Sequence, residues 1–194
     1  MKAIIKQVEN FAKKNSESDD IHGFPHVLRV KKLAIEIGIK VGANLQILEF
    51  AALLHDIGRI KEKTDAKKRN HAIISADMAL RFLKSENFNI SEEFIENVIH
   101  CIKAHSFSNN IKPCTLEAKV LSDADKIDAL GAIGIYRTIG FTVKKGGGIN
   151  DVINHLEQKI MRLIDLLYLE ESKKLAMCRH QYVIEFYQKI KKEI

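Results

Sequence analysis

The chain has 194 residues, a length that allows one domain with a substantial buried core. Nearly half of its residues are apolar, but no apolar stretch reaches the roughly 18–20 residues of a membrane span. The charged N-terminus is not typical of a signal peptide. The net charge of +6 suits an anionic ligand such as a phosphate ester, although a lysine-rich solvated surface is the simpler explanation.

The cysteines and the basic runs bear on the cellular compartment and on nucleic-acid binding. Cys101, Cys114 and Cys178 are odd in number and widely spaced, which is typical of reduced thiols, so we expect a cytoplasmic protein. Much of the positive charge lies in Lys61–Arg69 and Lys189–Lys192. Neither run interleaves aromatic residues, so the sequence offers little support for nucleic-acid binding.

The apolar pattern predicts an all-α chain with no repeat and no linker, and therefore a single domain over residues 1–194. We expect helices at about 2–15, 25–41, 45–57, 70–86, 91–105, 115–130, 131–143, 149–168 and 172–192. Pro25, Gly58 and Ser91 are the residue types that mark helix ends. Lys61–Lys68 shows no apolar period, which predicts a charged loop. A short extended segment near Gly140–Val143 is an alternative to helix there.

Polar residues interrupt the apolar faces of three predicted helices. His26 lies on the apolar face of its helix, His55 and Asp56 end the next one, and Asp125 and Asp128 follow Leu121 and Ala124. A buried carboxylate needs a counter-charge, a metal or neutralisation. Each residue alone is better explained as a satisfied core group. Together they favour one divalent cation, because two carboxylates and two neutral imidazoles compensate its charge.

The other histidines differ in whether they lie on the apolar face of a predicted helix. His71 and His105 lie on apolar faces and are candidates for a second metal or a substrate phosphate, with local helix capping as the alternative. His100 lies on the opposite face of its helix and is interpreted as a surface residue. His22 precedes Pro25 and is a candidate for the mouth of the site.

The order His26, His55-Asp56, Asp125 resembles the HD-domain superfamily of metal-dependent phosphohydrolases. The segments His26-Val-Leu-Arg-Val30 and Leu54-His-Asp-Ile-Gly58 look like its first-histidine helix and its namesake doublet. The segment from Ser122 to Gly134 looks like the last-aspartate helix of a bacterial and archaeal branch of about this length. One departure is Gly23, where related proteins often carry aspartate.

The resemblance implies an HD-domain helical bundle. Its metal-site core would span about 20–130, and C-terminal helices at about 149–194 would pack on that core. The implied metal ligands are His26, His55, Asp56 and Asp125. Asp125 is chosen because family members place this aspartate directly before a basic residue, which leaves Asp123 and Asp128 to orient helices or support the ligands.

The implied activity is hydrolysis of a phosphate ester or anhydride in a small phosphorylated substrate, a nucleotide among the candidates. The cofactor would be Mn, Fe, Ni, Co, Zn or Mg, as one ion or as two bridged by Asp56. His105 or His71 is a candidate to donate a proton to the leaving oxygen. The basic candidates for substrate phosphate are Arg29, Arg59, Lys126, Lys159 and Arg179, each with a plain surface or ion-pair role as the alternative.

Two other function classes stay open. Some HD-fold relatives hold two irons and oxidise their substrates, and the same six residues (His26, His55, Asp56, His71, His105 and Asp125) could supply such a pair. A non-catalytic nucleotide or metal sensor would bind ligand without forming product. The sequence identifies neither the substrate nor the metal nor the oligomeric state.

Overall fold

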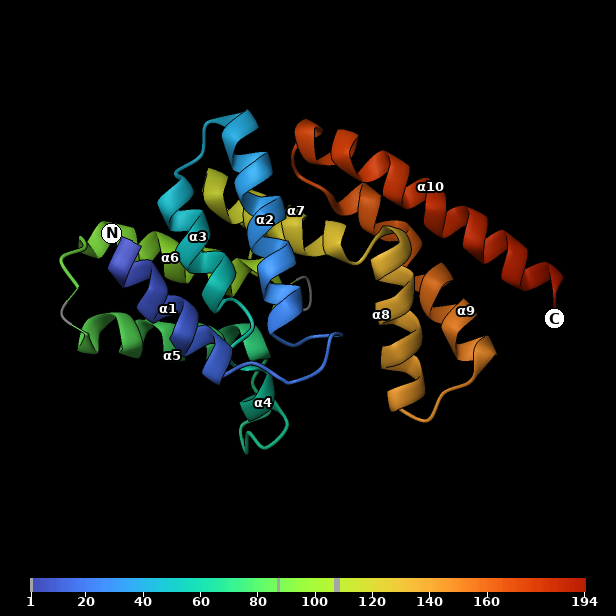
Figure 1. The fold of residues 1–194 in the computed structure, drawn as a ribbon, viewed down its shortest axis with the longest axis horizontal. Coiled ribbons are helices and arrows are strands. Elements are labelled where there is room, and N and C mark those ends of the chain that lie inside the picture. Colours follow the sequence, from blue (N-terminus) through green and yellow to red (C-terminus); the bar gives the residue numbers. More distant parts are fainter. Residues whose placement is uncertain (1, 87, 107–108) are drawn as a thin grey trace. The chain divides into compact units, whose positions relative to one another are not determined.

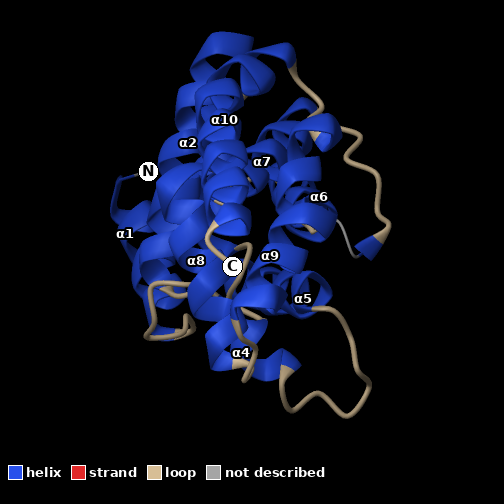
Figure 2. Ribbon diagram, turned by 90° about the vertical axis from the view of Figure 1, so that its right-hand side faces the viewer, coloured by secondary structure: helices blue, strands red, loops and turns tan. Residues whose placement is uncertain are grey.

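The computed structural model describes residues 2–86, 88–106 and 109–194. These residues form helices, turns and loops, with no strand among them, which confirms the all-α prediction (Figure 2). They divide into two compact units, one up to Ser122 and one from Asp123 to Ile194. None of the described helices is both long and apolar enough to span a membrane.

The first unit is built around α3 (Figure 1), whose apolar residues from Ile47 to Leu54 are all buried. This helix contacts α1, α2, α5 and α6, and α4 packs on α5. Asn44 caps α3 by accepting hydrogen bonds from the backbone N–H groups of Gln46 and Ile47. The helices of this unit are α1 (Lys2–Lys14), α2 (Phe24–Val41), α3 (Leu45–Leu54), α4 (Arg59–Glu62), α5 (His71–Ser85) and α6 (Glu92–His105).

Helix α7 (Leu116–Asp128) runs through the boundary between the units. The second unit continues with α8 (Gly131–Lys144), α9 (Ile149–Gln158), the 3₁₀ helix η2 (Ile160–Leu166) and α10 (Glu170–Lys192). Gly131 begins α8 at φ +75°, a left-handed conformation that favours glycine. A buried ion pair of 2.8 Å between Asp128 Oδ2 and Arg137 Nη1 joins the end of α7 to α8.

The structure differs from the predicted elements in several places. Helix α3 ends at Leu54, before the expected 57, and the one-turn helix α4 overlaps the start of the expected charged loop; in α4 the Glu62 N–H donates to the Gly58 carbonyl at 2.9 Å. Residues Gly140–Val143 are helical, not extended. The expected helix at 149–168 breaks at Lys159, where η2 takes over.

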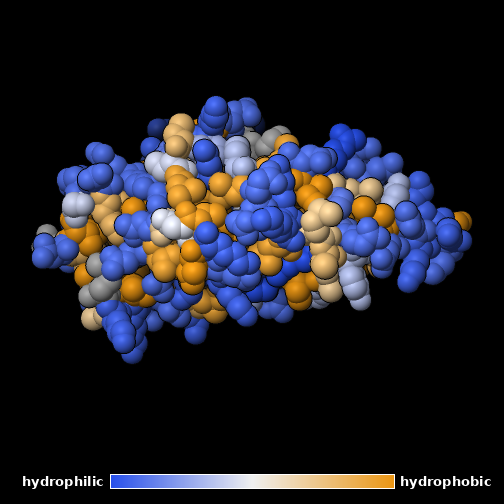
Figure 3. Space-filling view, turned by 90° about the horizontal axis from the view of Figure 1, so that it is seen from above, coloured by the Kyte–Doolittle hydropathy of each residue, from blue (hydrophilic) through white to orange (hydrophobic). Residues whose placement is uncertain are grey.

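The surface is charged with scattered apolar residues. The face shown in Figure 3 carries many hydrophilic side chains, with hydrophobic residues exposed between them. Helix α8 exposes Ile133, Tyr136, Ile139 and Val143, which follow one another at a spacing of three or four residues. Exposed apolar residues are common on protein surfaces.

Candidate metal centre

His55 and Asp56 lie in a buried turn that follows α3. Neither is more than 2% exposed. The turn is pressed against the start of α5, because Gly58 has no side chain and its N–H donates to Ser75 Oγ at 2.8 Å. A Cβ at Gly58 would lie 2.6 Å from the His71 carbonyl oxygen and from the Ser75 nitrogen. This close backbone approach brings His71 to the His55-Asp56 turn.

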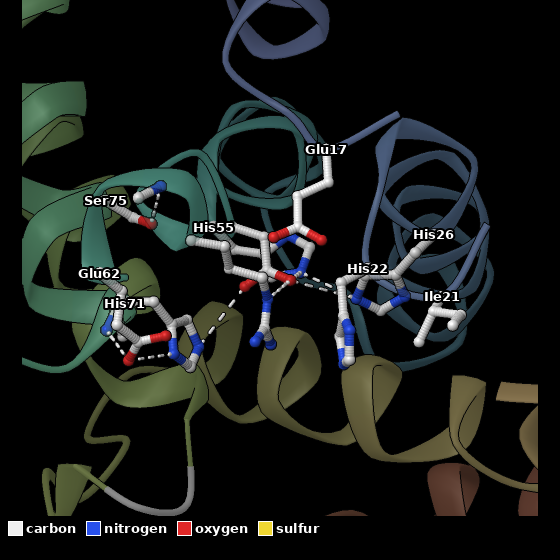
Figure 4. Close-up of polar contacts among 12 residues, drawn as sticks. Glu17, Ile21, His22, His26, His55, Glu62, His71 and Ser75 are labelled. Carbon is white, nitrogen blue, oxygen red and sulfur yellow. Dashed lines mark hydrogen bonds and ion pairs between the residues drawn. The ribbon is translucent and has the colours of Figure 1, made fainter. Parts of the chain in front are cut away.

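The Asp56 carboxylate lies between two pairs of histidines, of which Figure 4 labels His26, His55 and His71. Its Oδ2 is 3.5 Å from His26 Nε2 and 3.6 Å from His55 Nε2. Its Oδ1 is 3.5 Å from His71 Nε2 and 3.6 Å from His105 Nε2. The ligand atoms of each set, Asp56 with one histidine pair, lie within 4.8 Å of one another. We call the set with His26 and His55 the first set, and the set with His71 and His105 the second set.

Hydrogen bonds donated by Nδ1 orient three of the rings so that their Nε2 atoms face Asp56. The Nδ1 of His55 donates to the Ala52 carbonyl at 2.7 Å, and that of His105 donates to the Ile102 carbonyl at 2.6 Å. The Nδ1 of His71 is 3.3 Å from Glu62 Oε1. A carbonyl oxygen only accepts, so the proton resides on Nδ1, and a neutral ring then has its lone pair on Nε2.

Three buried atoms of the second set lack hydrogen-bond partners, and their chemistry fits a cation. Asp56 Oδ1, His71 Nε2 and His105 Nε2 are buried and have no hydrogen-bond partner among the described residues. Leaving such atoms unsatisfied costs about 1–3 kcal/mol each. All three are electron-pair donors, so one divalent ion would satisfy them together.

Burial and neighbouring charges keep Asp56 charged and His71 neutral, the protonation states in which these residues bind metal. Burial by itself would raise the pKa of Asp56, but Arg59, His55 and contacts with His105 and His26 hold that pKa well below its usual range. Burial, helped by the charge of Arg59, lowers the pKa of His71 to about 4. At neutral pH the carboxylate is therefore charged and the His71 ring is neutral, as metal binding requires.

Comparison with known proteins assigns the family. The HD domain matches residues 23–130, more than half of the chain and all of the histidine–aspartate cluster. The chain is an HD-domain protein. This match confirms the resemblance to the HD-domain superfamily that the sequence motifs indicated.

Several proteins are similar to this HD-domain chain over its length. YpgQ of Bacillus subtilis, itself uncharacterised, is 34% identical over 181 residues, which cover 89% of this chain and 84% of YpgQ. The crystal structure of YpgQ in complex with ADP has a TM-score of 0.79 at 32% identity, covering 98% of this chain and 97% of that one. An HD-superfamily hydrolase from Bacillus thuringiensis has a TM-score of 0.75 at 30% identity, covering 99% of this chain and 97% of that one.

A more distant similarity covers part of the chain. Ribonuclease Y of Treponema denticola is 36% identical over 104 residues, which cover 54% of this chain and 18% of ribonuclease Y. The chain therefore spans less than a fifth of that relative's length.

The first unit of the HD-domain chain brings most of the predicted site residues together. The Nε2 atoms of four histidines lie within 3.6 Å of an Asp56 carboxylate oxygen: His26, His55, His71 and His105. Arg29 is half-buried one turn after His26. Arg59, predicted to contact substrate, has its Nε 2.5 Å from Asp56 Oδ2. His100 lies apart from the cluster, half-buried, and its Nε2 accepts a hydrogen bond from the Cys114 N–H at 2.9 Å.

The remaining candidates belong to the second unit, and their site roles stay predictions. Asp125 is half-buried in α7, and the buried Lys126 lies with its Nζ 5.2 Å from the centroid of the Tyr168 ring. Lys159 is exposed at the end of α9. Arg179 donates from Nη1 to the Ile127 carbonyl at 3.3 Å, a contact typical of a helix C-terminus.

Asp123 has a structural role in the second unit. Its two carboxylate oxygens accept hydrogen bonds from the backbone N–H groups of Tyr168 and Leu169, at 2.9 and 3.0 Å, immediately before α10. We expect Asp123→Asn to lower the free energy of unfolding by about 1–3 kcal/mol, because an amide N–H₂ would face a backbone donor. Urea unfolding measures the loss, and divalent-ion binding should be unchanged. A loss of ion binding without a loss of stability would contradict this role.

One functional candidate, Glu62, was missed from sequence. It lies in the stretch interpreted as a charged loop, and its Oε1 accepts from the His71 backbone N–H at 2.8 Å. A single turn is too short to produce a recognisable period.

Proposed function

We propose that this HD-domain protein is a metal-dependent phosphohydrolase that cleaves a phosphate ester or anhydride, with a nucleotide as the leading substrate class. One observation carries the proposal: each oxygen of Asp56 faces its own pair of imidazole Nε2 atoms. A carboxylate shared in this way suits two divalent ions held side by side.

The ligands divide between the two sets. His26, His55 and Asp56 Oδ2 would hold the first ion, and Asp56 Oδ1, His71 and His105 would hold the second. We propose Asp125 as a further ligand of the first ion, on the strength of its motif. When bound, divalent ions of this kind lower the pKa of a water molecule and polarise a phosphoryl oxygen.

The protein's own residues supply the remaining chemistry. Because the Nδ1 of His105 donates to the Ile102 carbonyl, its Nε2 is a lone-pair donor, which favours a ligand role for His105 over a proton-donor role. Arg59 holds the Asp56 carboxylate in orientation through Oδ2. We propose that Arg29, Lys126, Lys159 and Arg179 contribute positive charge toward an anionic substrate.

Nucleotides lead the substrate classes because the similar protein YpgQ has been crystallised with ADP. A nucleoside phosphate carries the ester and anhydride bonds that this chemistry cleaves. The basic pI of about 9.1 is compatible with an anionic substrate.

A phosphatase screen tests the proposal. Purified protein is assayed against nucleotides and sugar phosphates with Mn, Ni, Co, Mg and Fe in turn, and its metal content is measured as purified. We expect hydrolysis that depends on added ion and that falls by about 10³-fold in His55→Ala and Asp125→Ala, since several kcal/mol of charge stabilisation are lost. The helical circular dichroism should persist in both variants.

Controls and rival outcomes are distinguishable. Asp165→Ala removes an exposed carboxylate from η2 and should leave hydrolysis unchanged. Unchanged turnover in metal-loaded His55→Ala would contradict the ligand assignment. The shared Asp56 also suits two irons, so a mixed-valent iron signal in anaerobically purified protein would favour the oxidation chemistry. Tight nucleotide binding without product would favour a sensor.

A further inference from the structure

The second set differs from the first in how its histidines are oriented. His55 and His105 each donate from Nδ1 to the main-chain carbonyl three residues earlier in the chain, of Ala52 and Ile102 respectively. In both cases the acceptor is part of the helix that the histidine ends or follows. His71 has no such carbonyl, because it is the first residue of α5.

Glu62 supplies the partner that His71 lacks. Its Oε1 lies 3.3 Å from His71 Nδ1 and accepts from the His71 backbone N–H at 2.8 Å. The two contacts fix both the ring and the main chain of His71, and Figure 4 shows them between the labelled residues Glu62 and His71. The His71 ring thereby presents Nε2 toward Asp56 Oδ1.

The one-turn helix α4 places Glu62 within reach. Its main chain is anchored by the hydrogen bond of 2.9 Å from the Glu62 N–H to the Gly58 carbonyl. Its first residue, Arg59, bonds to Asp56, and its last residue, Glu62, bonds to His71. Helix α4 therefore connects two ligands of the second set through two side chains one turn apart.

We propose that Glu62 is a positioning residue for the second ion, an inference that rests on the two-ion form of the proposed function. A carboxylate that accepts the Nδ1 proton makes an imidazole a stronger ligand and holds the ring in its binding orientation. Glu62 also adds one negative charge to a set that otherwise has only the shared charge of Asp56. Among the described residues, the side chain of Glu62 contacts His71 and neither histidine of the first set. We therefore expect its effect to be selective for the second ion.

Calorimetric titration with Mn²⁺ alone tests this selectivity in the full-length chain. In Glu62→Ala, we expect the second Mn²⁺ to bind about 10–100-fold more weakly, the usual effect of removing a group that orients a metal-bound histidine. The first Mn²⁺ should bind as in the wild type. Glu62→Gln keeps an oxygen that can accept from His71 but loses the charge, so its second Mn²⁺ should bind with intermediate affinity.

A spectroscopic measurement separates this role from general destabilisation. Two bridged Mn²⁺ ions give an exchange-coupled electron paramagnetic resonance signal, and at the same Mn²⁺ load Glu62→Ala should give the signal of isolated Mn²⁺. His71→Ala should give the same change. Glu36→Ala is the matched control, because it removes a half-buried glutamate that pairs with Lys40 on α2.

Each result decides the inference. Selective weakening of the second ion supports it, and equal weakening of both ions, or no change, overturns it. Wild-type protein that takes up fewer than two Mn²⁺ ions overturns it together with the two-ion form of the proposed function. Wild-type protein that takes up two ions but hydrolyses no phosphate ester or anhydride overturns the proposed activity, and the titration of Glu62→Ala then still decides the role of Glu62.

Discussion

Asp56→Asn should abolish binding of both divalent ions and lower any metal-dependent hydrolysis by about 10³-fold or more, since several kcal/mol of stabilisation are lost. The expected effect is the largest in the protein because Asp56 alone belongs to both sets. The amide has nearly the same shape, but it carries no charge and has an N–H₂ group in place of one oxygen. Metal analysis after gel filtration and the phosphatase assay measure the two losses.

The control for this variant is Asp77→Asn, the same change at a half-buried aspartate that pairs with Arg69 at 3.0 Å. It should retain both ions. A variant of Asp56 that loses one ion and keeps the other at wild-type affinity would show that this carboxylate serves one set only. Comparison with His26→Ala and His71→Ala would then show which set it serves.

Gly58→Ala should destabilise the protein by about 1–3 kcal/mol and reduce ion binding as well, because the added Cβ overpacks a tight site. The new atom would meet the His71 carbonyl oxygen and the Ser75 nitrogen, each at 2.6 Å. Both are main-chain atoms, so the start of α5 must move away from the His55-Asp56 turn. Urea unfolding and Mn²⁺ titration measure the two consequences.

Gly148→Ala provides the comparison. Apart from Gly148 and its two chain neighbours, no heavy atom of the described residues lies within 4 Å of a Cβ at that position, so the change should cost less than about 1 kcal/mol. If Gly58→Ala were as mild as this control, the close approach between the turn and α5 would not be what holds His71 in place.

The helices were largely predictable from sequence because each amphipathic pattern reports burial within one helix. Helices α2, α5, α6 and α10 begin and end within two residues of expectation. The sequence left an extended conformation open for Gly140–Val143, because glycine and β-branched residues lower helix propensity. The segment is nevertheless helical, and Thr142 Oγ1 donates to the Thr138 carbonyl inside α8.

The sequence by itself determined the helical class, the family, and which polar residues lie on apolar faces. Those conclusions need only the 3.6-residue period and short motifs. The tertiary structure decided that the Asp56 oxygens face different histidine pairs and that Glu62 bonds to His71. The physical reason is that a helical period gives the buried face of one helix, whereas the distance between side chains on different helices depends on packing. Here that packing depends on the close contact of Gly58 with α5.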